Sequence, residues 1–147
     1  MLKTYVCAAC EKVILTADNV ASLISLFNKI IITAPPEAEV PKNAVAPKEW
    51  AIFSIFDTEP GDELKEYTHF AQILYPDQSQ FSEIAKSKLR IELNKRAQVN
   101  VQVPAFPIGQ VGNYTVRVWI EENQRTVVGP IEFKIELEII RQVHKAP

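Results

Sequence analysis

The sequence has few of the residues around which common catalytic sites are built. Its four glycines are scattered and form neither a GxGxxG motif nor a lysine-bearing phosphate loop. A Gly-x-Ser-x-Gly nucleophile elbow is absent, and neither of the two histidines stands in a recognisable nucleophile context. These absences argue against the common enzyme classes, so we expect a protein with no catalytic residues and no cofactor.

Long apolar runs and clusters of basic charge are also missing. The net charge is −2, so neither nucleic acid nor an anionic membrane is expected as a partner. No stretch approaches the ~18–20 apolar residues of a membrane span. Lys3 and the triplet Ala8-Ala9-Cys10 look superficially like a lipoprotein export signal, but the apolar run between them is shorter than a secretory core. We therefore expect a cytoplasmic protein with reduced cysteines.

Cysteine and histidine are too sparse to predict a metal site. Cys7 and Cys10 form a CxxC, and His69 and His144 would complete a zinc set by number alone, but the two histidines are far apart in sequence. On a strand, residues i and i+3 point to opposite faces, so the two thiols would diverge. A redox CxxC needs a helix N-terminus, which the pattern does not provide. We expect both cysteines to be small buried strand residues. We expect His69 to be a structural histidine with its hydrogen bonds satisfied, rather than a catalytic base.

The residues that are present predict one all-β domain over residues 1–147. There are ten prolines, and turn signals recur along the chain at the spacing typical of a β-sandwich. Alternating or doubly apolar segments predict strands at residues 3–10, with an extension to 15, and at 50–56, 66–75 and 97–103. We expect seven to nine mainly antiparallel strands in a β-sandwich, with room for one short helix.

Four segments are less regular. Residues 20–32 fit a helix capped by Asp18, with an apolar stripe at helical spacing, and equally a strand rich in β-branched residues; both readings stay open. Residues 81–93 permit a short helix but are interpreted mostly as strand. Residues 33–49 carry four prolines and predict a loop that straps an edge of the sandwich, and residues 141–147 a short flexible tail.

The clearest pattern is a closing hairpin. Tyr114, Val116, Val118 and Ile120 alternate with polar residues, and the return strand alternates from Ile131 to Ile139. With the turn centred on Asn123-Gln124, the predicted outward pairs are Trp119 with Val128 and Arg117 with Pro130. The predicted inward pairs set Val127, Ile131 and Phe133 against Ile120, Val116 and Tyr114.

An exposed tryptophan beside an arginine has the composition of a binding hot spot. The hairpin therefore predicts an interaction surface at Arg117, Trp119 and Val128. The alternative is that the N-terminal strand or the proline loop covers Trp119, and the sequence leaves the two readings balanced.

One loop gathers carboxylates. Asp57, Glu59, Asp62 and Glu63 lie in a single predicted turn and could supply oxygen ligands to calcium, as loops at the end of a sandwich sometimes do. The competing interpretation is a solvated acidic turn with no metal.

Two resemblances add to this picture. The ending, with Gly112-x-Tyr114 before an alternating strand, resembles the final hairpin of immunoglobulin-like sandwiches, which implies that the Tyr114 hydroxyl bonds back to the backbone as a structural corner. The whole chain also resembles an uncharacterised bacterial family of small single-domain proteins through Cys10-Glu11, the segment 22–28 and the Gly-x-Tyr hairpin. That resemblance favours strand for residues 22–32 and implies no activity.

The sequence thus predicts a non-catalytic interaction module whose partner is another protein or a second copy of itself. The alternative function is a sandwich that binds calcium or a small ligand through its end loops, at residues 33–49 and 57–63.

Overall fold

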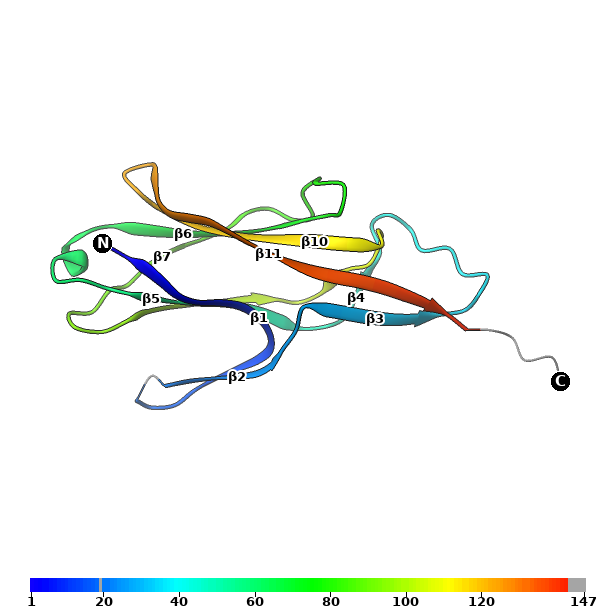
Figure 1. Cartoon of the computed structure of the whole chain (residues 1–147), viewed down its shortest axis with the longest axis horizontal. Coiled ribbons are helices and arrows are strands. Elements are labelled where there is room, and N and C mark those ends of the chain that lie inside the picture. Colours follow the sequence, from blue (N-terminus) through cyan, green and yellow to red (C-terminus); the bar gives the residue numbers. More distant parts are fainter. Residues whose placement is uncertain (19, 143–147) are drawn as a thin grey trace.

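The structure is a computed structural model, which describes residues 1–18 and 20–142. Two sheets pack face to face (Figure 1). We name them sheet A and sheet B. Sheet A has the order β2 (Ala21–Leu26), β1 (Lys3–Leu15), β5 (Trp50–Asp57), β8 (Ala97–Val103). Sheet B has the order β3 (Lys29–Ala34), β11 (Arg125–Arg141), β10 (Gly112–Glu122), β6 (Tyr67–Leu74), β7 (Ala85–Lys88).

The all-β prediction is confirmed, with nine strands in the two sheets. The described chain adds only a two-stranded ribbon of β4 (Val45–Ala46) and β9 (Phe106–Pro107), and a single helical turn, η1 (Asp62–Leu64). Strand pairing is antiparallel except where β3 runs parallel to β11. The main core lies between the sheets, where Trp50, Phe106 and Tyr114 are fully buried and the Phe106 ring contacts the rings of the other two.

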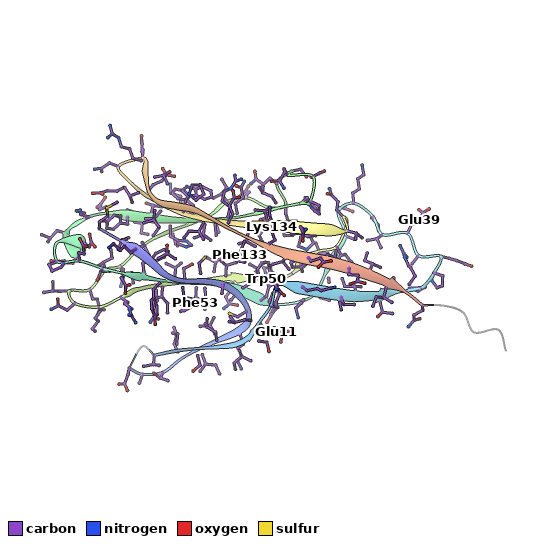
Figure 2. All side chains as sticks on the ribbon, in the orientation of Figure 1. Glu11, Glu39, Trp50, Phe53, Phe133 and Lys134 are labelled. Carbon is purple, nitrogen blue, oxygen red and sulfur yellow. The ribbon has the colours of Figure 1, made fainter. Side chains whose placement is uncertain are left out.

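Strand β5 is apolar on both faces because both of its faces are covered. Its inner side faces sheet B, while Ala51 and Phe53 on its outer side are fully buried. Their cover is the hairpin formed by β2 and the second half of β1, which contributes Val13 and Leu23. We call residues 11–18 and 20–26 the flap. Figure 1 shows the flap leaving the plane of sheet A, and Figure 2 shows Phe53 on the side of β5 that faces it.

The open choice over residues 20–32 resolves to strand, turn and strand. β2 ends at Leu26 and β3 begins at Lys29, so the chain crosses here from sheet A to sheet B. The Phe27 N–H donates to the Ala9 carbonyl at the crossing. A helix is not formed because the apolar residues serve different clusters, Leu23 beneath the flap and Ile30 in the main core. Tertiary burial outweighs local helical spacing here.

Several segment boundaries differ from the predictions. The loop predicted at residues 33–49 is shorter, since β3 continues to Ala34 and β4 pairs with β9. Within residues 81–93 only Ala85–Lys88 is strand, and no helix forms there. Arg141 belongs to β11 rather than to the tail, and Gln142 donates its N–H to Ala34. The rest of the predicted tail, residues 143–147, lies outside the described residues.

The predicted register of the closing hairpin is wrong beyond its turn. Glu122 pairs with Arg125 as expected, but the register slips twice, so that Ile120 pairs with Val128 and Val118 with Ile131. Gly129 lies at this irregularity with φ +84°, a conformation that glycine adopts without strain. Two slips of one residue restore the alternation, so Phe133 still faces the core and Lys134 the outside (Figure 2).

Candidate functional site

The side of sheet B that faces away from sheet A carries a stacked aromatic pair. The rings of Phe70 on β6 and Trp119 on β10 have their centroids 5.2 Å apart with an interplanar angle of 8°. The two residues are register partners, so their side chains leave the sheet on the same face. The Trp119 indole Nε1–H donates to Glu121 at 3.0 Å, which holds the ring in place.

Charged side chains flank the pair. Lys86 on β7 is the register partner of Phe70, and its Nζ lies 5.9 Å from the Phe70 ring centroid. On the other side, the Arg117 Nε–H donates to Glu132 of β11 at 2.7 Å. We name the outer face by the residues that carry it: Phe70, Lys86, Lys88, Arg117, Trp119, Glu121, Glu132. Both rings are half-buried.

Two of the three predicted interaction residues lie together on this face. Arg117 and Trp119 are both there, but Val128 is not. Val128 pairs with the fully buried Ile120, is 9% exposed, and packs in a cluster between the sheets, because the register slip turns it inward. From the sequence, the N-terminal strand or the proline loop was the possible cover for Trp119. In the structure, the ring that lies against Trp119 is Phe70.

Sequence reasoning missed Phe70 and Lys86. The available signal was β6 itself, where Tyr67, His69, Ala71 and Ile73 alternate inward. On the other side of the strand, Phe70 is a large apolar residue between two polar ones, Thr68 and Gln72. The pairing of Phe70 with Trp119 needs the order of the strands, which alternation alone does not give.

In the acidic turn at residues 57–63, the carboxylates bind other groups of the protein and are not free to bind a ligand. Asp62 is 1% exposed, and its carboxylate accepts from the Glu59 N–H at 2.8 Å and from the Tyr67 hydroxyl at 2.9 Å. The N-terminal amine lies 3.2 Å away. Burial opposes ionisation of Asp62, but these donors outweigh it and lower the pKa of the carboxyl. The Tyr67 pKa is raised by burial and by its bond to Asp62.

The other three carboxylates of the turn also bind protein groups. Asp57 accepts from Arg96 at 2.7 Å, Glu59 from the N-terminal amine at 2.9 Å, and Glu63 from the Gly61 N–H at 2.9 Å. Across residues 1–18 and 20–142, no group of three or more potential metal-ligating side chains is placed to hold an ion. The four acids therefore do not converge on one point.

Tyr114 makes the backbone contact expected of a corner residue. Its hydroxyl donates to the Gln110 carbonyl at 2.6 Å and accepts from the Gln110 N–H at 3.2 Å. Burial raises the pKa of Tyr114 to about 12. The residue thus ties the start of β10 to the loop before it, and its role is structural.

The two cysteines diverge, as a strand requires. Cys7 packs against the core between the sheets and accepts a hydrogen bond from Ser54 at 3.5 Å, while fully buried Cys10 lies beneath the flap. Both are free thiols, and burial raises the pKa of each. Raised thiol pKa values disfavour the reactive thiolate.

The sequence predicted a structural histidine at position 69 whose ring nitrogens are hydrogen-bonded, and the structure differs from that prediction. It is 1% exposed, and neither ring nitrogen has a hydrogen-bond partner within the described part of the chain. The Phe56 ring lies beside it, with centroids 6.1 Å apart. Burial lowers the pKa of His69 to about 4, so the imidazole is neutral near pH 7.

Among the hollows on the surface of the described residues, two are the most pronounced. The larger, about 660 Å³, lies between the flap and the loop that joins β7 to β8. The smaller, about 240 Å³ and lined mainly by apolar side chains, lies between β7 and β8, at the open side of the sandwich. Neither contains a residue that the sequence singled out as a candidate for function.

Comparisons with known proteins add no functional assignment. No model of a protein family matches the sequence, and a search of curated proteins finds no similar one. The resemblance to a bacterial family therefore stays a prediction. Over the part of the chain that the structure describes, no helix has the length and apolar character needed to cross a membrane.

Proposed function

We propose that the protein is a non-catalytic protein-interaction module that works through the outer face. The observation that carries this proposal is the stacked Phe70–Trp119 pair, which lies in the middle of a sheet face flanked by charged residues. Figure 1 shows the β10–β11 turn and the β6–β7 loop rising at the two ends of this side of sheet B. Large aromatic side chains within a polar rim are typical of the centres of protein interfaces.

A second copy of the chain is the partner that the charges favour. Across the strands, Lys86 and Lys88 on β7 lie to one side of the aromatic pair and Glu132 on β11 lies to the other, while Glu121 lies next to Trp119 on β10 itself. A two-fold axis parallel to the strands would place the lysines of one copy over the carboxylates of the other. The face is self-complementary in that arrangement, as an isologous dimer requires.

The test is the oligomeric state of two matched variants, measured by sedimentation equilibrium. Trp119→Ala removes the centre of the outer face, whereas Leu64→Ala truncates an apolar side chain that is 85% exposed elsewhere. We expect Trp119→Ala to weaken self-association by about 2 kcal/mol or more, as truncation of a hot spot does. Leu64→Ala should leave it unchanged. Circular dichroism checks that both variants are folded.

A charge variant then tests the arrangement. Lys86→Glu places a carboxylate where the partner copy presents Glu121 and Glu132, so it should weaken association, and the loss should shrink at high salt. If the wild-type chain stays monomeric at all concentrations, or if Trp119→Ala changes neither its association nor its capture of any other protein, the outer face is not the working surface.

The other function considered from the sequence was calcium or small-ligand binding by the end loops. The acidic turn gives it no support, because Asp57, Glu59, Asp62 and Glu63 are each engaged by protein groups. The cytoplasmic assignment belongs to our proposal too; two free cysteines support it.

A further inference from the structure

The hollow beneath the flap is a cleft with two different walls. One wall is the tip of the flap, and the other is the loop between β7 and β8, with Ile55 of β5 and Gln98 of β8 between them. Figure 1 shows the flap tip and this loop at the same end of the molecule. The volume of about 660 Å³ falls within the range of small-molecule sites.

Apart from Asp18, the flap wall is apolar, and parts of it are exposed. Nearer its base, Val13 and Leu23 pack on the buried Phe53 and close the flap against sheet A. At the tip, Leu15 is 48% exposed and Val20 is 59% exposed, although both line the cleft. Apolar side chains at a hairpin tip gain free energy when a ligand removes them from water.

The loop wall is cationic. It presents Arg90, Lys95 and Arg96 to the cleft, against two carboxylates in the lining, Asp18 and Glu92. Lys95 pairs with Glu92 at 2.7 Å. Over the described residues Arg90 forms no ion pair, so it is the cation of this wall that is available to a ligand.

Arg96 is held in place beside the cleft. Its Nε–H donates to Asp57 at 2.7 Å, and its guanidinium carbon lies 3.9 Å from the Tyr5 ring centroid. A guanidinium has five donors, so the bond through Nε leaves others for an anion. A fixed arginine loses little conformational entropy when it binds a carboxylate.

We propose that this cleft binds a small organic anion with an apolar body, such as a medium-chain carboxylate. The apolar body covers Leu15, Val20 and Ile55, and the carboxylate binds Arg90 with help from Arg96. This inference is independent of the proposed function, because the cleft opens on the outer side of sheet A and the outer face belongs to sheet B.

The first experiment compares three probes on the full chain by calorimetry and by backbone amide chemical shifts. Octanoate, octanol and octylammonium share one apolar body and differ only in the head group. We expect octanoate to bind about ten-fold more tightly than octanol, which is the effect of one charge-assisted hydrogen bond. Octylammonium should bind most weakly. The shifts should map to residues 15–18, 20 and 21, to Ile55 and to residues 90–98.

The second experiment changes the cleft itself. Arg90→Ala should remove the preference for octanoate over octanol, and Arg90→Lys should restore part of it, while Arg125→Ala, an equal change at the exposed β10–β11 turn, should leave it intact. Leu15→Ser should weaken octanoate and octanol alike. Thermal melts establish that each variant folds.

Three results would overturn the inference. They are no binding of octanoate, equal binding of octanoate and octanol, and an octanoate affinity that Arg90→Ala leaves unchanged. Shifts confined to the smaller hollow between β7 and β8 would likewise place the ligand elsewhere.

Discussion

Protonation of His69 should destabilise the fold between pH 7.5 and pH 5. The side chain is 1% exposed, and neither nitrogen has a hydrogen-bond partner among the described residues, so burial lowers its pKa from 6.5 to about 4. The unfolded chain then binds more protons than the folded chain below pH 6.5. Stability is therefore fully present above that pH and is lost as the pH falls towards 4.

The size of the effect follows from the two pKa values. Linkage gives a loss of about 2 kcal/mol at pH 5 relative to pH 7.5, and a limit of about 3 kcal/mol below pH 4. Carboxyls with lowered pKa values cost stability mainly below their ordinary pKa values, which are 3.8 for Asp62 and 4.5 for Glu59. The window from pH 7.5 to pH 5 thus isolates the histidine.

Urea unfolding, followed by the fluorescence of buried Trp50, measures this slope. The comparison is between the wild-type chain and His69→Leu, which fills a similar volume and cannot titrate. We expect a loss of about 2 kcal/mol over the window in the wild type and a nearly flat profile in the variant. If both proteins lose the same stability, the imidazole is hydrated or paired in solution and the reasoning is refuted.

Three further substitutions test the fold by the same unfolding assay. Phe53→Ala should cost about 3–5 kcal/mol because it opens a cavity between β5 and the flap; a cost below 1 kcal/mol would mean that the flap is not packed there. Tyr114→Phe should cost about 1–2 kcal/mol, since it unpairs the Gln110 backbone, and no loss would show that water replaces the hydroxyl. Gly129→Ala should destabilise more than Gly61→Ala does. Both glycines have positive φ, but a Cβ at Gly129 would lie 2.7 Å from the Ile131 nitrogen and one at Gly61 in open space; equal losses would contradict this.

The closing hairpin shows which side-chain directions can be predicted from the alternation of apolar and polar residues. It correctly divided Tyr114, Val116 and Val118 from Arg117 and Trp119, because a two-residue period follows directly from strand geometry. It placed Val128 on the wrong side, because the two slips near Gly129 have no signature in the alternation of the return strand. A one-residue slip reverses every side chain until the next slip corrects it.

The candidate sites were less predictable than the strands. The acidic turn was visible as four nearby carboxylates, but their partners are the N-terminus, Arg96 and backbone groups that only the fold brings close. The cleft was not predicted at all. Its flap wall and its loop wall are separated by some seventy residues of sequence. The local sequence pattern of neither wall predicts that the two lie close together.

The sequence by itself determined the class of fold, the strand that is buried on both faces, the corner at Tyr114 and the divergence of the two cysteines. The corner at Tyr114 follows from the resemblance to the final hairpin of immunoglobulin-like sandwiches, and the others follow from local period or from the direction of a side chain on its own strand. Only the tertiary structure decided that Phe70 stacks on Trp119, that His69 is buried without a partner, and that the flap and a basic loop form a cleft. Those features depend on strand order and sheet packing, which join residues that share no local pattern.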